Sequence, residues 1–402
     1  MKFSEKIKKI PASPTLEITA KAKALKAQGL NILSFSSGEP DFDTPSNIKQ
    51  VAIKAIKEGK TKYTPVGGIP ELKEAIVKKF KNDNNLSYKS SEVTVNCGGK
   101  HSFFNLMQVL LNPGDEVIIP GPYWVSYPPM VTLAGGKPIV IMTTAKNNFK
   151  ITPQMLKDKI SSKTRAVVLN SPSNPTGVAY TKKELEDLSA VIRKNILIIS
   201  DDIYESILYD DFKFCNIANL SADLKERTVV LNGVSKAYSM TGWRIGYMAA
   251  AQEIIKKIEI LQSQSTSNST SISQWAALEA LTGPQTALAK MNKAFLKRRD
   301  IIINEFKKIK EITCQVPNGA FYVFPNIKNI FYLPGWKKLK KQYNSKYQST
   351  IFSSYLLDQA QVAVVPGIAF GSDNYIRISF ATSEENIRQG LKNIKGAIDK
   401  LR

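Results

Sequence analysis

The sequence predicts an α/β protein, with a large domain built on a doubly wound, mostly parallel sheet and a smaller α+β domain. Three observations indicate this: short apolar runs without polar alternation, amphipathic helical segments between them, and a change of pattern in the last third of the chain. Continuous apolar runs are typical of strands covered on both faces, and strands separated by helices form parallel sheets. A chain of 402 residues exceeds what one hydrophobic core normally supports, so we expect two domains.

The expected strands of the large domain share a short run of β-branched or other apolar residues. They are Val93–Val95, Val117–Ile119, Ala166–Leu169, Ile196–Ile199, Val229–Leu231 and Tyr247–Ala250. Helical patterns lie between them, over Lys100–Leu111 and Lys182–Arg193. Thr181 and Glu184 form a capping box at the start of the second helix. We expect the large domain to span residues 45–290.

The last third of the chain predicts the smaller domain, which we expect to comprise residues 1–44 and 291–402, with the N-terminal segment acting as a lid. A long charged helix is expected over Lys293–Lys310. The strands expected here are Ala320–Phe324, Val362–Val365 and Tyr375–Phe380. The stretch Lys337–Ser349 is rich in Lys, Tyr, Asn and Ser, which favours a solvated insertion over a basic binding patch.

Composition argues against several classes of function. The 56 basic residues exceed the 34 acidic ones, but only nine are arginine, so scattered lysine predicts a solvated surface rather than a nucleic-acid interface. His101 is the only histidine and the three cysteines form no CxxC pair. We therefore expect no disulfide framework, no metal site and no Ser-His-Asp triad. No apolar stretch has the length of a membrane span or signal peptide, which predicts a cytoplasmic protein without membrane contact.

Three of the expected strands end in unusual polar sequences: SPSNPTG, DDIYE and VSKAYSMTGWR. Ligands of open α/β sheets bind beyond the carboxyl ends of the strands, so these sequences should line one crevice. Lys236 would be partly desolvated and near other cations, both of which lower an amine pKa, and a neutral amine can attack a carbonyl. Considered alone, Lys236 is more simply a surface lysine. Arg244 and Ser235 could hold an anion, and Gly99 opens a helix whose first amides could bind phosphate.

In this order and spacing, the three motifs resemble the fold-type I pyridoxal-phosphate aminotransferases. More narrowly, they resemble the class I bacterial aspartate aminotransferase branch, some members of which also accept prephenate. GEPDFDTP, KYTP, GPYWVSY, GAFY and VAVVPGIAFG extend the resemblance over nearly the whole chain. It implies an enzyme that binds pyridoxal 5'-phosphate and moves the amino group of L-aspartate to 2-oxoglutarate by ping-pong exchange, giving oxaloacetate and L-glutamate.

The resemblance also implies residue roles. Lys236 holds the cofactor covalently and serves as general base and then acid. Asp201 faces the pyridine nitrogen, because the D-x-x-Y spacing with Tyr204 favours it over Asp202. Tyr204 and Asn174 hydrogen-bond the phenolic oxygen. The remaining cofactor residues are Trp124, which stacks on the ring, Gly99, Lys100, Ser235 and Arg244 around the phosphate, and Tyr63 and Asn268 at an interface shared with a second subunit.

For the substrate, the resemblance implies that Arg377 binds the α-carboxylate with its planar fork, beside Gly38, Trp124 and Asn174. The segment Gln262–Asn268 lacks the arginine that the animal-type branch uses for the distal carboxylate. Ser13, Thr15 and Lys100 are the candidates for that group. The expected partners are amino acids, 2-oxo acids and a second copy of the chain in a homodimer. Two alternatives stay open: an aromatic, alanine or prephenate aminotransferase, and a non-catalytic basic binding protein on the same fold.

Overall fold

The computed structural model describes residues 1–10 and 14–402, with the side chains of 14–16 left out of the description. Within these residues it contains a seven-stranded sheet in the order β2-β8-β7-β6-β5-β3-β4. The strands are β2 (Val93–Asn96), β3 (Glu116–Gly121), β4 (Lys137–Met142), β5 (Thr164–Asn170), β6 (Leu197–Asp201), β7 (Thr228–Gly233) and β8 (Gly246–Ala249). Strand β8 runs antiparallel to both of its neighbours, and the four remaining strand pairs, from β7 to β4, are parallel, so the predicted mostly parallel sheet is confirmed.

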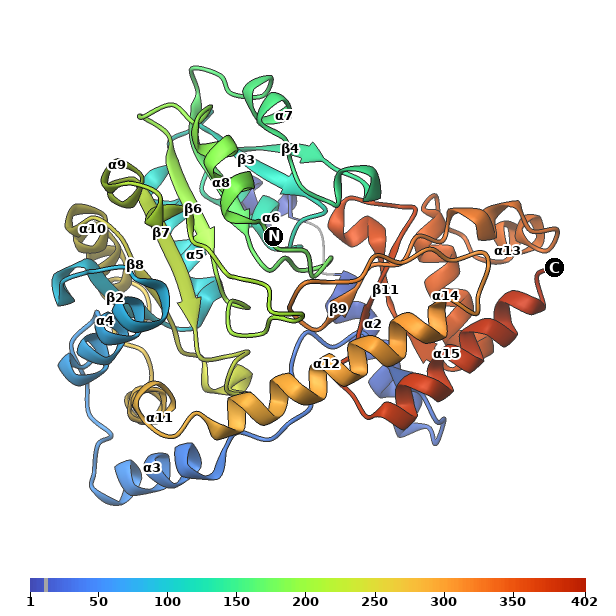
Figure 1. The fold of residues 1–402 in the computed structure, drawn as a ribbon, viewed down its shortest axis with the longest axis horizontal. Coiled ribbons are helices and arrows are strands. Elements are labelled where there is room, and N and C mark those ends of the chain that lie inside the picture. Colours follow the sequence, from blue (N-terminus) through green and yellow to red (C-terminus); the bar gives the residue numbers. More distant parts are fainter. Residues whose placement is uncertain (11–13) are drawn as a thin grey trace.

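Helices cover both faces of this sheet (Figure 1). They are α3 (Ser46–Lys57), α4 (Pro70–Asn84), α5 (Gly99–Leu110), α6 (Tyr127–Leu133), α7 (Pro153–Lys157), α8 (Lys182–Ser189), α9 (Ala222–Glu226), α10 (Gln252–Ser263) and α11 (Ser271–Thr282). Successive strand residues enter different cores: Val117 and Ile119 pack with the core under α5 and α10, whereas Ile118 packs with the core under α8. Side chains alternate between the two faces of a strand, which explains why the strands read as continuous apolar runs.

A second lobe lies beside the sheet, and helix α12 (Thr286–Phe306) extends from one lobe into the other (Figure 1). Its helices are α13 (Trp336–Gln342), α14 (Gln348–Ala360) and α15 (Glu384–Asp399), with α2 (Pro14–Ala27) from the N-terminus beside them. Helix α1 (Glu5–Lys8) instead contacts α6 of the large-sheet lobe. Its strands are β1 (Leu33–Ser34), β9 (Tyr322–Val323), β10 (Val362–Ala363), β11 (Val365–Pro366) and β12 (Ile376–Ser379). β1 pairs with β10, so the N-terminal segment joins the C-terminal part of the chain. The domain boundaries at 44/45 and 290/291 stay a prediction.

Several expected elements differ in the structure. Strand β4 was not expected from the sequence. It is a half-buried strand at the edge of the sheet, where the proline near its start, Pro138, is tolerated. The run Val362–Val365 forms two strands in different sheets, since β10 pairs with β1 and β11 with β12. Helix α8 ends at Ser189, although the buried Ile192 continues its apolar pattern. The apolar periodicity beyond Ser189 therefore reflects buried side chains and not a continued helix.

Two further differences concern the smaller lobe. Helix α12 begins at Thr286 rather than Lys293, because Ala, Leu and Met before Lys293 are strong helix formers. The stretch Lys337–Ser349 is not a simple solvated insertion: α13 buries Trp336 and Leu339 while its lysines stay exposed. The capping box of Thr181 and Glu184 is confirmed.

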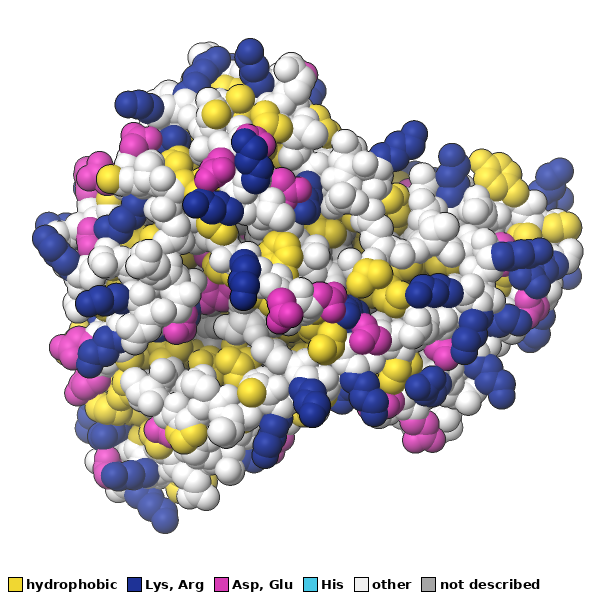
Figure 2. All heavy atoms as spheres, viewed as in Figure 1, with side chains coloured by type: hydrophobic (Ala, Val, Ile, Leu, Met, Phe, Trp, Pro, Cys, Tyr) yellow, Lys and Arg dark blue, Asp and Glu magenta, His cyan; other side chains and the backbone are white. Residues whose placement is uncertain are grey.

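Lysine and arginine side chains are spread over both lobes, with acidic side chains among them (Figure 2). This distribution agrees with the net charge of +22 being carried mainly by scattered lysine. Among the helices of residues 1–10 and 14–402, none is long and apolar enough to cross a membrane.

Candidate active site

A cavity of about 1500 Å³ opens at the carboxyl ends of β5, β6 and β7, between the two lobes. The three polar sequences that follow these strands all reach it, as expected for an open α/β sheet. The predicted residues that line it are Gly38, Gly99, Lys100, Trp124, Asn174, Asp201, Tyr204, Ser235, Lys236, Arg244 and Arg377. Residues from far apart in the sequence thus meet in one place.

Lys236 follows β7, and its amine donates a hydrogen bond of 2.5 Å to the carbonyl oxygen of Gly38. Burial lowers the pKa of Lys236 to about 8, and the cations of Arg377 and Arg244 lower it as well, although Glu39 opposes them. The neutral fraction near neutral pH is therefore larger than for an ordinary lysine, and the neutral form is the one that attacks a carbonyl. Lys236 has the environment of a reactive amine rather than that of a surface lysine.

Asp201 is the last residue of β6, and its carboxylate accepts a hydrogen bond from the hydroxyl of Tyr127. Burial raises the pKa of Asp201, whereas the Tyr127 hydroxyl, the Ile203 amide and the charge of Lys236 act against that rise. The Asp202 carboxylate has other partners. It accepts a hydrogen bond of 2.8 Å from the Ser200 hydroxyl and another from the Asn216 side-chain amide. Only the first of the two adjacent aspartates lines the cavity.

Tyr204 is buried beside the cavity, and its hydroxyl lies 2.9 Å from the hydroxyl of Tyr322 on β9. Burial raises the pKa of Tyr204 well above its ordinary value, so the phenol keeps its proton. Tyr322 comes from the GAFY motif, whose role the sequence did not reveal. Its side chain links the two lobes at this point.

The start of α5 packs against β8 and Arg244. A Cβ on Gly246 would lie only 2.3 Å from the amide nitrogen of Gly99, and one on Gly98 would lie 2.6 Å from Nη2 of Arg244. Gly98 also has a positive φ of 88°, which side chains rarely adopt. Arg244 is held by a 2.7 Å hydrogen bond to the Thr241 carbonyl. The first amides of a helix have no partner within it, so helix start and guanidinium together favour an anion.

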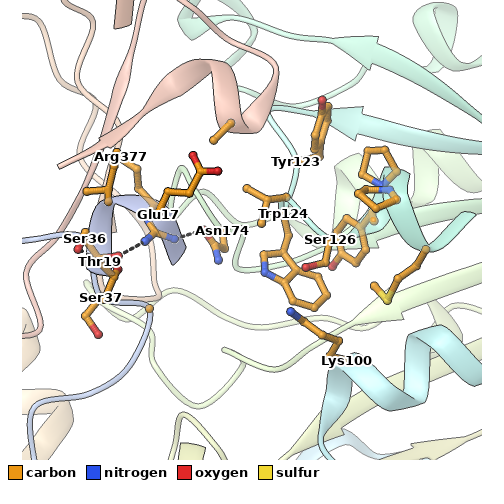
Figure 3. Close-up of a pocket in the computed structure, with 18 of the residues that line it drawn as sticks. Glu17, Thr19, Ser36, Ser37, Lys100, Tyr123, Trp124, Ser126, Asn174 and Arg377 are labelled. Atoms are coloured by element: carbon orange, nitrogen blue, oxygen red, sulfur yellow. Dashed lines mark hydrogen bonds between the residues drawn. The ribbon is translucent and has the colours of Figure 1, made fainter. Parts of the chain in front are cut away.

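Arg377 lies on β12 and is 2% exposed. Its Nη1 donates to Asn174 Oδ1 at 3.2 Å, and its Nη2 donates to the Ser36 carbonyl at 2.7 Å (Figure 3). Among the described residues, nothing accepts a hydrogen bond from its buried Nε. An unpaired buried donor of a charged group is costly, so Arg377 is suited to a carboxylate ligand in the cavity.

Trp124 and Lys100 lie next to each other at the cavity, with the Lys100 amine 5.3 Å from the centre of the indole ring (Figure 3). Burial, followed by the charge of Arg244, lowers the pKa of Lys100. Glu17 of α2 also lines the cavity, although the sequence analysis did not single it out. The wall near Trp124 therefore carries both signs of charge.

Two predicted residues, Tyr63 and Asn268, do not line the cavity. Tyr63 is 91% exposed and lies outside the cavity of its own chain. Asn268 does not line the cavity, and its side-chain amide donates a hydrogen bond of 2.7 Å to the Ser269 carbonyl. Ser13 falls outside the described residues, and the side chain of Thr15 is not described. For Tyr63 and Asn268, the predicted roles depend on a second subunit.

The geometry agrees with the comparisons to known proteins. Residues 31–394 match the model of the family described as aminotransferase class I and II. The chain belongs to this family. It is 50% identical over 397 residues to the aspartate/prephenate aminotransferase of Nitrosomonas europaea, covering 98% of this chain and 99% of that one. It is 47% identical over 401 residues to the aspartate aminotransferase of Bacillus subtilis, with 100% of both chains covered.

Solved structures agree in fold as well. The aspartate aminotransferase of Rhizobium meliloti has a TM-score of 0.94 and 44% identity, with all of both chains covered. That of Thermus thermophilus, solved with maleate, has a TM-score of 0.91 and 38% identity, covering 99% of this chain and 100% of that one. The predicted fold-type I architecture and the predicted aminotransferase branch are confirmed, and this chain is a pyridoxal-phosphate-dependent aminotransferase.

The residues of the cavity fit that coenzyme. The close approach of Gly246 to Gly99 leaves the start of α5 and Arg244 side by side as a site for a phosphate. Asp201 offers a carboxylate to a protonated ring nitrogen, and Lys236 offers an amine to an aldehyde. The orphaned Nε of Arg377 is left for a second anion. The cavity thus offers two separate groups that can bind an anion, Arg244 and Arg377.

Proposed function

We propose that this aminotransferase transfers the amino group of L-aspartate to 2-oxoglutarate, giving oxaloacetate and L-glutamate. The observation that carries the proposal is the buried Arg377, whose unpaired Nε accompanies the reactive amine of Lys236 in one cavity. A planar guanidinium binds a carboxylate with two parallel hydrogen bonds. Relatives named aspartate aminotransferase support the choice of substrate, and the maleate bound by the Thermus protein is a four-carbon dicarboxylate, as aspartate is.

The chain's residues would hold the coenzyme by distinct groups. Ser235, Arg244 and the amides of Gly99 and Lys100 would bind its phosphate. Asp201 would keep a proton on the ring nitrogen, and Trp124 would stack on the ring. Tyr204 and Asn174 would donate hydrogen bonds to its phenolic oxygen. These assignments support one orientation of the ring in the cavity.

When bound, pyridoxal phosphate supplies an electron sink that stabilises negative charge at the substrate Cα. Arg377 and the Gly38 segment would orient the substrate by its α-carboxylate, with Asn174 and Trp124 against it. In its neutral form, Lys236 Nζ would take the proton from the substrate Cα as a general base. It would then give this proton up again as a general acid. The low pKa of about 8 suits an amine that must be base and acid in turn.

The distal carboxylate needs a second cation. We propose Lys100 for this role, together with Ser13 and Thr15, because the segment Gln262–Asn268 contains no arginine. The Lys100 amine beside Trp124 is one of the cationic groups that line the cavity. The nearby Glu17 would disfavour longer acidic side chains that approach α2.

We further propose a homodimer in which Tyr63 and Asn268 complete the partner's site, since Tyr63 is exposed and otherwise unused. The large domain would comprise residues 45–290 and the small domain residues 1–44 and 291–402, with the N-terminal segment as a lid. The pairing of β1 with β10 supports this division. We place the enzyme in the cytoplasm.

Amino-donor and keto-acid profiling of the coenzyme-loaded enzyme tests the proposal. Aspartate with 2-oxoglutarate should give the highest kcat/KM among aspartate, alanine, phenylalanine and tyrosine donors. Prephenate as acceptor tests the second candidate, which the name of the Nitrosomonas relative favours. A preference for alanine or an aromatic donor would contradict aspartate specificity, and binding of DNA without transamination would favour the non-catalytic alternative.

A further inference from the structure

Tyr127 is a fully enclosed tyrosine at the start of α6, 2% exposed, that the motif roles leave unused. Its hydroxyl donates to Oδ2 of Asp201. Its ring meets Trp124 edge-on at 5.1 Å between centroids and Phe103 at 4.8 Å. A single side chain therefore contacts both Asp201 and Trp124, the two residues proposed to meet the ring nitrogen and the ring face.

The hydrogen bond acts on a carboxylate in an unfavourable place. Asp201 is half-buried at the cavity, and its desolvation favours the neutral form. A donor to the carboxylate favours the charged form, and among the influences that act this way on Asp201 the Tyr127 hydroxyl is the largest. The amide of Ile203, at 3.4 Å from Oδ1, and the charge of Lys236 contribute less. Without Tyr127, Asp201 would keep only these weaker influences.

Tyr127 itself remains a donor. Burial raises its pKa well above the ordinary value, and the charge of Asp201 raises it further, so its proton stays on the phenol. The other ionisable groups near it are Tyr204 and Asp202. Burial also raises the pKa of Tyr204 well above its ordinary value, and that of Asp202 likewise. Tyr204 therefore keeps its proton, and Asp201 is the carboxylate that accepts the Tyr127 hydrogen bond.

We propose that Tyr127 is a positioning residue that holds the Asp201 carboxylate charged and in one orientation toward the coenzyme, while its ring supports Trp124. This inference rests on the proposed role of Asp201. It differs from simple core packing, because a packing role needs the ring of Tyr127 and not its hydroxyl. Phenylalanine at this position keeps the ring and removes only the donor.

The test compares Tyr127→Phe with Tyr180→Phe as the matched control. Tyr180 is also buried, and its hydroxyl accepts a hydrogen bond of 3.1 Å from the Ile151 amide. It does not line the cavity that contains Lys236. In the resting holoenzyme, a ring nitrogen that loses its proton withdraws less charge, so the nitrogen of Lys236 keeps its own proton to higher pH. Tyr127→Phe should therefore shift the pH midpoint of the bound coenzyme's absorbance upward and weaken coenzyme binding. It should lower kcat about tenfold with little change in KM, the size of one hydrogen bond to a charged group.

Asp201→Asn and the double variant separate the possible failures. If Tyr127 acts through Asp201, adding Tyr127→Phe to Asp201→Asn changes the absorbance midpoint and coenzyme affinity no further. If Asp201→Asn alters both properties and Tyr127→Phe alters neither, the inference about Tyr127 is wrong while the role of Asp201 stands. If Asp201→Asn alters neither, the proposed role of Asp201 fails first. A Tyr127→Phe effect matched by Tyr180→Phe would assign Tyr127 to packing alone and overturn the inference.

Discussion

Arg377 and Asn174 lie 203 residues apart in sequence, and the Arg377 guanidinium donates to the Asn174 amide oxygen across 3.2 Å. The bond joins β12 of one lobe to the loop after β5 of the other, at the edge of the cavity. It also orients the guanidinium, because its other terminal nitrogen is held by the Ser36 carbonyl at 2.7 Å. The group proposed to receive the substrate carboxylate is thus already positioned by two contacts.

Replacing Arg377 with lysine keeps the charge and removes the planar fork. We expect kcat/KM for amino donors to fall about 10- to 100-fold, because a hydrogen bond to a charged group contributes about 1.5–3 kcal/mol. Coenzyme absorbance should stay unchanged. Steady-state kinetics and a spectrum of the same preparation check this, with Arg388→Lys on the surface of α15 as the control. Equal kinetics for Arg377→Lys and wild type would contradict the carboxylate role.

Replacing Gly246 with alanine should displace the start of α5, because the added Cβ would lie 2.3 Å from the Gly99 nitrogen. Overpacking of this kind costs about 1–3 kcal/mol. We expect weaker coenzyme binding, measured by absorbance titration of the coenzyme-free protein. Gly242→Ala is the matched control, since nothing lies within 4 Å of its added Cβ. Comparable losses in both variants would show that the close approach has no part in holding the phosphate.

Lys236 should react at lower pH than ordinary lysines. Burial lowers its pKa to about 8, so its neutral fraction grows as pH rises through 8. Exposed Lys183 has its pKa raised by the hydrogen bond to Asp187, and it should become reactive only at higher pH. Acylation of the coenzyme-free protein, followed peptide by peptide with mass spectrometry, checks this order. Identical pH profiles for the two lysines would refute the environment described for Lys236.

Tyr63 tests the shared site. Although Tyr63 lies outside its own cavity, we expect Tyr63→Ala to weaken coenzyme binding about tenfold, by loss of one hydrogen bond to a charged phosphate. Lys236→Ala alone should abolish turnover. When the two variants are mixed and allowed to exchange subunits, one site of each mixed dimer regains both residues, so tight binding and turnover should return.

The control for Tyr63 is Tyr332→Ala, another exposed tyrosine, at 74% exposure. It should bind coenzyme as wild type does. If the mixture of Tyr63→Ala and Lys236→Ala performs no better than Tyr63→Ala by itself, Tyr63 does not reach across to a second subunit.

Much of the fold could be read from local pattern. Apolar runs located six of the seven strands of the large sheet, because strands buried on both faces must be apolar throughout. The edge strand β4 was not predicted, although Ile139–Met142 is a continuous apolar run. Val362–Val365 was one run in sequence and two strands in space, because its pairing partners lie in distant segments.

The motifs indicated the chemistry, and their resemblance to a family supplied the residue roles. Lys236, Asp201 and Tyr204 could be named because they follow strands whose ends meet at one edge of the sheet. Tyr127 and Tyr322 could not, although both stand in motifs that were recognised, because a hydroxyl's partner depends on how distant segments pack. Sequence alone thus settled which residues stand at the strand ends. Packing of distant segments decided which donors face Asp201, Tyr204 and Arg377, since hydrogen bonds require contact within about 3 Å.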